Sequence, residues 1–154
     1  MAHIKIDVDD EQLRQALRVA PNKMVNAMHR SLNRSAVQTQ RYFRENITKR
    51  RSVFTGHLRE SVHFQFKNKL TVVVEPEAKY ADSVEFGSRP HWVSLRKIAP
   101  WAKFHGLEPA MVQQSIRKKG TRKHPFLQKT VKQSEQFAVE DMQKKMNKAI
   151  KEIL

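Results

Sequence analysis

Residues 53–90 read VFTGHLRESVHFQFKNKLTVVVEPEAKYADSVEFGSRP, and this stretch decides the fold class. Residues 62–66 alternate apolar and polar side chains, which is the period of a half-buried strand. A polar turn at 67–69 and a β-branched run at 70–74 complete the pattern of a β-hairpin. Because Pro76 has no N–H to donate to a ladder, we expect the second strand to end just before it, at about Glu75.

The hairpin is preceded by a loop with a flexible hinge and followed by a short helix. Thr55-Gly56 supplies the hinge, and residues 58–61 lead into the first strand. The apolar spacing over residues 80–86 predicts one or two helical turns, which Gly87 ends.

Longer elements flank this stretch on both sides. Residues 3–8 alternate strictly and predict another short strand, after which a first amphipathic helix runs to Ala20. An apolar stripe with steps of three and four predicts a helix of about seven turns over 22–46. A second long amphipathic helix is expected over 126–153. The arginines on the face of the 22–46 helix opposite its stripe indicate either a solvated face or a binding face.

Two short helices are expected between the hairpin region and the last helix. Ser94 begins a pattern that ends at Gly106, with Pro100 inside it, so we expect a kink or a late start. Glu108-Pro109 opens a second helix, which Gly120 closes. The sequence therefore predicts a helical insert at 88–122, lying over one end of the hairpin sheet.

Composition limits the class of protein. The 154 residues suit one domain over 1–154. Only 39% are hydrophobic, which suits either a protein that completes its core against neighbouring copies or one with long exposed helices. Thirty Lys and Arg against fifteen Asp and Glu give a formal charge of +15, which implies attraction to nucleic acid or acidic proteins. With no cysteine, thiol catalysis and thiolate metal sites are excluded. No apolar run approaches a membrane span and no signal-peptide core is present, so we expect no membrane contact and synthesis in a cytoplasm.

Three short segments in this order resemble the tail-component family of long-tailed phages, which includes head–tail joining and tail-completion proteins akin to minor tail protein Z. They are T-G-x-L-x-x-S at 55–61, Y-A-x-x-V-E-F-G at 80–87 and P-F-L at 125–127. The residues that carry the resemblance are Thr55, Gly56, Leu58, Ser61, Tyr80, Ala81, Val84, Glu85, Phe86, Gly87, Pro125, Phe126 and Leu127. The long segment between Gly87 and Pro125 departs from many members of the family.

The expected elements together predict an α+β domain, in which a small antiparallel sheet of three or four strands packs against the two long helices. The resemblance implies what such a domain does. It implies a structural virion protein without enzymatic activity, a subunit of a sixfold ring at the neck between head connector or adaptor proteins and the tail terminator or tail tube. The protein would be made in the bacterial host cytoplasm.

Two basic segments are candidate contacts to DNA in the channel or to an acidic partner. The first lies in the loop before Thr55, and the second lies at the end of the insert, over 117–123. A mobile, solvated loop is the alternative for the first segment. The candidate residues are Lys49, Arg50, Arg51, Arg117, Lys118, Lys119, Arg122 and Lys123.

Two other functions compete with this interpretation. The helices within 95–119 could form a degenerate helix-turn-helix, whose second helix would present Gln113 and Arg117 to DNA. Glu75, Glu77 and Lys79 resemble the acid-x-lysine spacing of metal-dependent nucleases, although Pro76 displaces these acids from strand geometry. The seven histidines are scattered without a ligand motif, so we expect no metal and no cofactor.

Overall fold

The computed structural model describes residues 11–49 and 55–153. In chain order the elements are α1 (Glu11–Val19), α2 (Pro21–Lys49), α3 (His57–Glu60), β1 (Val62–Asn68), β2 (Thr71–Pro76), α4 (Ala81–Phe86), α5 (Leu95–Phe104), α6 (Pro109–Lys119) and α7 (Leu127–Lys151). This mixture of helices and an antiparallel hairpin confirms the α+β class. None of the helices in these two ranges is both long and apolar enough to span a membrane.

The sheet is smaller than the sequence predicted. The described residues contain a sheet of two strands, whereas three or four were expected. The strand expected at 3–8 lies outside the described residues.

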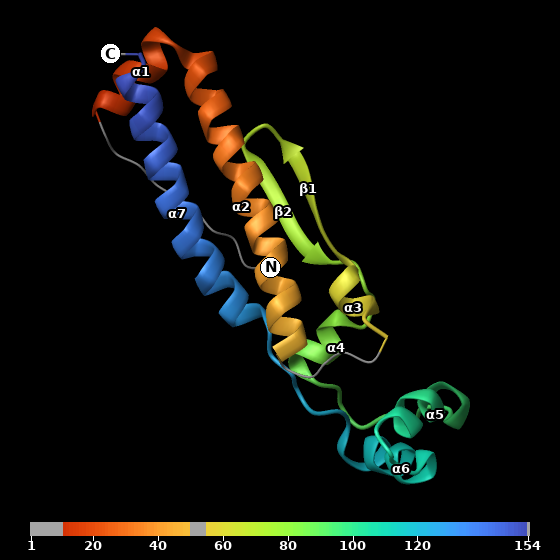
Figure 1. Ribbon diagram of the computed structural model, residues 1–154. Coiled ribbons are helices and arrows are strands. Elements are labelled where there is room, and N and C mark those ends of the chain that lie inside the picture. The colour runs from red at the N-terminus through yellow and green to blue at the C-terminus, as the bar shows by residue number, and fades with distance from the viewer. Residues whose placement is uncertain (1–10, 50–54, 154) are drawn as a thin grey trace.

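Helix α2 is the central element. It lies between α7 on one side and the hairpin on the other, and α7 runs antiparallel to it (Figure 1). Met24, Ala36 and Phe43 of the predicted apolar stripe are buried, so this face of α2 packs against its neighbours as expected. The hairpin therefore packs mainly on α2, and only its end nearest α4 shares a cluster with the beginning of α7.

Two separate apolar clusters hold the long helices together. The first cluster lies where α1 meets the last turns of α7, and in it Ala16 and Met24 pack against Met142, Met146 and Ile150. The second cluster lies at the opposite end of α2, and consists of Phe43, Ile47, Leu58, Val62, Ala78, Ala81 and Phe126. The modest size of both clusters agrees with the lean composition.

A polar seam joins α2 to α7 between these clusters. The buried carboxylate of Asp141 accepts a hydrogen bond from Ser31 Oγ at 2.8 Å and pairs with Arg34 at 3.3 Å. Nearer the second cluster, Asn46 Nδ2 donates to Thr130 Oγ1 at 2.9 Å. Arg34, predicted on a solvated or binding face, thus reaches α7 instead.

The hairpin places its aromatic residues on one face. Phe64 pairs with Val74 and Phe66 with Val72, so their side chains share the face that meets α2. The ring of Phe66 stacks on His29 of α2 with centroids 4.7 Å apart. β2 includes Pro76, one residue later than expected, because this end position opposite Val62 does not require an N–H donor.

The insert does not lie over the end of the hairpin sheet, contrary to the prediction. Residues 88–124, called the arm below, project beyond α4, and α5 and α6 pack chiefly on each other (Figure 1). Their two connecting segments bond to each other at Ser88 and Thr121, which holds the helices away from the hairpin. Helix α5 begins at Leu95 and continues through Pro100 to Phe104, so the late start does not occur.

Candidate assembly interface

The three segments that resemble the phage family meet at one end of α2. Leu58, Ala81 and Phe126, one residue from each segment, belong to the same buried cluster. Val84 and Leu127 pack against this cluster from its edge. Residues separated by more than forty positions in sequence therefore form a single structural unit, the motif cluster.

Glu85 connects the second segment to the third. Its buried carboxylate accepts hydrogen bonds from the backbone N–H groups of Phe126 at 2.7 Å and Leu127 at 3.0 Å. These N–H groups lie at the N-terminus of α7, where helix donors lack intrahelical partners and negative charge is favourable. The N–H of His124 also donates to the carbonyl of Val84 at 2.8 Å. Glu85 thus caps α7 from a distant helix.

Ser61 connects the first segment to the chain that follows β2. Its hydroxyl donates to the carbonyl of Leu58 at 2.9 Å and accepts from the N–H of Ala78 at 3.3 Å. Gly56, expected to be part of a flexible hinge, instead precedes α3 with a φ of 81° and is buried. The first segment is therefore a turn built into the motif cluster.

Tyr80 covers the motif cluster from outside. Its hydroxyl lies 3.3 Å from His57 Nδ1, and its side chain is partly exposed. Partial burial raises the pKa of Tyr80, and a hydrogen bond from the backbone of Leu58 offsets part of this rise. The contact between Tyr80 and His57 was not foreseen from the sequence.

Phe86 and Gly87 mark the border between the motif cluster and the arm. Phe86 is 69% exposed, whereas Ala81 and Glu85 of the same segment are buried. The arm adds the exposed apolar residues Trp92, Leu95, Trp101, Phe104, Leu107 and Met111. Exposed apolar surface of this extent is typical of a protein that binds other proteins.

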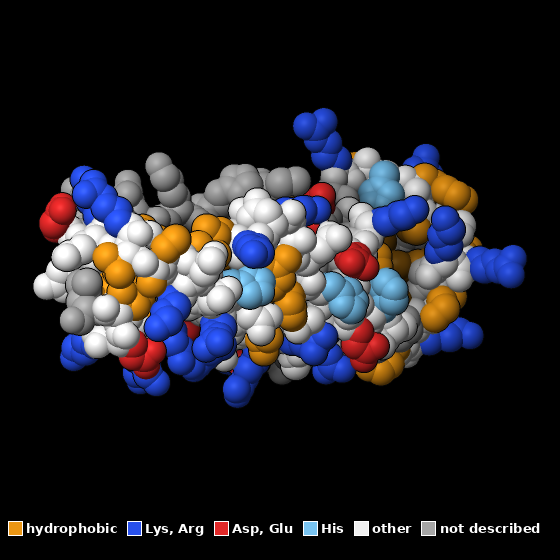
Figure 2. All heavy atoms as spheres, turned by 90° about the horizontal axis from the view of Figure 1, so that it is seen from above, with side chains coloured by type: hydrophobic (Ala, Val, Ile, Leu, Met, Phe, Trp, Pro, Cys, Tyr) orange, Lys and Arg blue, Asp and Glu red, His pale blue; other side chains and the backbone are white. Residues whose placement is uncertain are grey.

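The candidate basic contacts are exposed wherever the structure describes them. Lys49 ends α2, Arg117, Lys118 and Lys119 form the last turn of α6, and Arg122 and Lys123 follow in the arm. Arg50 and Arg51 lie outside the described residues. Figure 2 shows Lys and Arg side chains spread around the outline of the molecule, with fewer acidic side chains between them.

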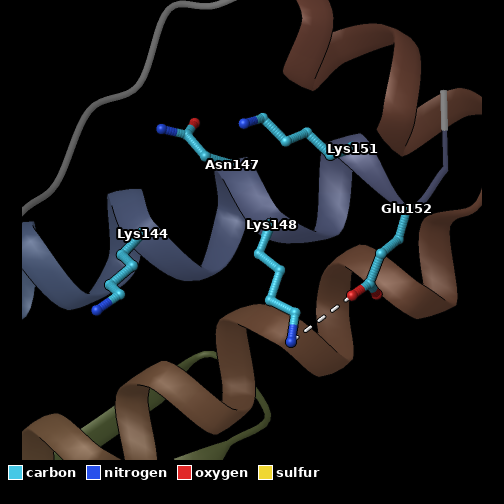
Figure 3. A pocket seen from close by; sticks show the side chains of 5 residues that line it. All are labelled: Lys144, Asn147, Lys148, Lys151 and Glu152. Carbon is cyan, nitrogen blue, oxygen red and sulfur yellow. Dashed lines mark ion pairs between the residues drawn. The ribbon is translucent and has the colours of Figure 1, made fainter.

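Two shallow hollows lie on the surface of the described residues. Lys144, Asn147, Lys148, Lys151 and Glu152 line a hollow on the last turns of α7, where Lys148 reaches toward Glu152 at 3.8 Å (Figure 3). A second hollow beside α3 is lined by His57, Glu60, Ser61, His63 and Glu77. Within residues 11–49 and 55–153, no group of three acidic or histidine side chains is placed to hold a metal ion.

The residues that suggested a nuclease or a helix-turn-helix lie at the end of β2 and on α6. Glu75 and Glu77 are both exposed, on either side of Pro76 at the end of β2. In α6, the half-buried Gln113 donates to the carbonyl of Val93 at 2.7 Å, so its amide is engaged within the arm. Arg117 is exposed on the same helix.

Comparison with known proteins identifies the class to which this scaffold belongs. A family model described as "Bacteriophage HK97-gp10, putative tail-component" matches residues 5–87, more than half of the chain. The chain belongs to this HK97-gp10-like family of phage tail components, which confirms the resemblance drawn from its motifs. No curated protein and no solved structure gave a significant match.

The matched region covers α1 to α4 and the hairpin. It therefore contains the first two motif segments, and ends before the arm and α7. The third segment, 125–127, joins the motif cluster from outside the matched region. Membership in this family favours a structural role in the virion over an enzymatic one.

Proposed function

We propose that this chain is a tail-completion or head–tail connector subunit, which acts by assembly and catalyses no reaction. It would form a sixfold ring at the virion neck, between the head connector or adaptor proteins and the tail terminator or tail tube. The observation that carries the proposal is the family match across residues 5–87. The protein would be made in the bacterial host cytoplasm and incorporated into the virion.

The packing of the chain supports a role in assembly. The two apolar clusters are small, whereas large apolar side chains outside the arm, such as Val37, Leu70 and Phe86, are exposed. A head-to-tail contact that closes into a ring buries such surface on every copy. Assembly would thus supply burial that the single chain lacks.

Deleting the gene from the phage and imaging the products tests the proposal. We expect filled heads and separate tails, with joining restored when the protein is supplied from a plasmid. A cryo-electron-microscopy map of the intact neck should contain a ring of this chain. Intact virions whose neck lacks the polypeptide would refute the proposal.

The exposed basic run of the arm favours one additional role, a contact with DNA passing through the ring. Such a contact would be to phosphates and blind to sequence, with log K falling by about 0.9 per phosphate for each unit of log salt. Specific binding to one DNA site would favour the helix-turn-helix interpretation instead. Mg²⁺-dependent DNA cleavage that is lost in Glu77→Ala, but kept in Glu60→Ala, would favour a nuclease.

A further inference from the structure

The arm has less internal packing than its length requires. Across residues 88–124, all of which the structure describes, Ala102 and Ile116 are the buried hydrophobic side chains. Helices α5 and α6 have 10 and 11 residues, and helices this short are marginal in water without tertiary packing. Because α5 and α6 pack chiefly on each other, the body of the protein supplies little of the missing burial.

The arm instead exposes the residue types that form the centres of protein interfaces. Trp92 is 67% exposed, Phe104 63% and Met111 71%. Aromatic residues and methionine are enriched at the cores of interfaces. Trp101, Phe104, Leu107 and Met111 all lie at or near the turn between α5 and α6, which forms an apolar tip. Trp92 and Leu95 continue the exposed apolar surface at the beginning of α5.

The arm also carries a one-sided charge. It contains nine Lys or Arg residues and a single acid, Glu108, which gives a formal charge of +8 with histidines neutral. The nine basic residues are exposed. The ion pairs between residues that the structure describes all lie outside the arm. The basic residues Arg117, Lys118 and Lys119 lie at the base, so the arm combines a basic base with an apolar tip.

The base of the arm is held in a fixed conformation. Ser88 and Thr121 exchange backbone hydrogen bonds at 3.3 and 3.2 Å, and their hydroxyl groups bond at 3.0 Å. Gly87 and Gly120 flank this bridge with φ of 75°. A held base presents the tip in one direction, which reduces the ordering cost of binding.

We propose that the arm docks into an apolar groove edged by carboxylates on a different protein of the virion. This inference rests on the proposed function only for the choice of virion proteins as partners. The family match ends at Gly87, where the arm begins, so the arm is suited to a partner particular to this virion.

Charge and shape favour an acidic virion protein as the partner of the arm over a second copy of the chain and over duplex DNA. A second copy of the chain carries a formal charge of +15 and an equally basic arm, so two arms repel each other. Duplex DNA would attract the basic residues, but its charged phosphate backbone offers no apolar surface to cover Trp92, Phe104 and Met111. An acidic protein surface with an apolar groove complements both features.

Titration of the full-length protein with each purified head-connector, tail-terminator and tail-tube protein of the same phage tests the inference. Isothermal titration calorimetry compares Trp92→Ser/Met111→Ser with the control Val19→Ser/Val37→Ser, which removes exposed apolar residues from the long helices. A second pair compares Lys118→Glu/Lys119→Glu with Lys144→Glu/Lys151→Glu on α7. A 30-base-pair duplex, about three helical turns, and sedimentation of the protein alone serve as the competing probes.

We expect one partner to bind, and each arm variant to raise its Kd about tenfold or more, while the controls change it less than about threefold. The inference would be overturned if the protein bound none of the virion proteins, or if arm and control variants lost affinity equally. It would also be overturned if the arm variants lost only DNA binding or self-association. A neck map in which the ring is present and the arm is unbound would refute the arm's role and leave the proposed function standing. Absence of the chain from the neck would refute the proposed function, and the titrations would still decide whether the arm binds an acidic partner.

Discussion

The carboxylate of Glu85 lies 2.7 Å from the backbone nitrogen of Phe126, forty-one residues further along the chain, and caps the N-terminus of α7. It accepts a second bond from Leu127 at 3.0 Å. This relationship joins the second family segment to the third, and places the beginning of α7 against the motif cluster.

Glu85→Ala should lower the free energy of unfolding by roughly 1–3 kcal/mol, because it leaves N–H donors at the helix terminus without a partner. Glu85→Gln should cost less, since the amide oxygen still accepts but carries no charge. Chemical denaturation measures both, with Glu140→Ala on the exposed face of α7 as the control. A loss in Glu85→Ala no larger than in the control would contradict the capping role.

The two glycines at the base of the arm should tolerate no side chain. A Cβ at Gly120 would lie 1.8 Å from the carbonyl oxygen of Ser88, and one at Gly87 would lie 2.5 Å from that of Thr121. Gly106→Ala is the matched control, because Gly106 also has a positive φ, of 67°, but nothing lies within 4 Å of its Cβ position. Backbone strain alone costs about 1–2 kcal/mol.

We expect Gly120→Ala and Gly87→Ala to open the base of the arm and to speed both its hydrogen exchange and its proteolysis. Gly106→Ala should cost only the strain. Equal protection of the arm in all three variants would show that the close backbone approach is not maintained in solution.

The polar seam between α2 and α7 contains two hydroxyl groups that the fold does not use. Ser35 Oγ and Ser134 Oγ are buried and have no hydrogen-bond partner among the described residues. Ser35→Ala/Ser134→Ala should therefore be neutral or raise the free energy of unfolding by up to about 1–2 kcal/mol. By contrast, Asp141→Ala should lower it by roughly 1–3 kcal/mol, since it leaves the buried hydroxyl of Ser31 unpaired. Thermal unfolding compares the two, and a loss of stability in the double serine variant would contradict the assignment.

Tyr80 should titrate above pH 10, because partial burial disfavours its phenolate and raises its pKa above the ordinary value of 10.0. Because the pKa of Tyr80 is raised in the folded state, the contribution of this tyrosine to the free energy of unfolding is fully present below pH 10. That stability is then lost as the pH rises through the raised pKa. Absorbance at about 295 nm follows phenolate formation as the pH is raised. Compared with the unsubstituted protein, Tyr80→Phe should lack one titration step, with a midpoint above pH 10. A midpoint at or below 10 would contradict the burial of this ring.

Local patterns predicted most of the helices and the hairpin. Helix α6 begins at Pro109 and ends before Gly120, and α4 ends before Gly87, as proline and glycine act on their immediate neighbours. The long helices follow their apolar stripes. The short α3 was missed, because four residues carry too little periodicity to distinguish a helical turn from a loop.

The roles of the family residues could not be derived from spacing. The sequence contains Glu85, Ser61 and Phe126 in recognisable segments, yet nothing local indicates that Glu85 caps α7 or that Ser61 bonds Ala78. The same holds for Asp141, whose partner Ser31 lies 110 residues earlier. The position of the insert was also predicted wrongly, since its direction depends on the bridge between Ser88 and Thr121.

The sequence by itself determined the class of protein through its motif segments, and the basic charge through its composition. It also determined the limits of nearly every described element, because periodicity and helix-ending residues act over a few neighbouring positions. Only the tertiary structure decided that three separate segments form one motif cluster and that the arm extends from the body with an apolar tip. These features depend on contacts between residues far apart in the chain, and such contacts form only once the long helices have packed.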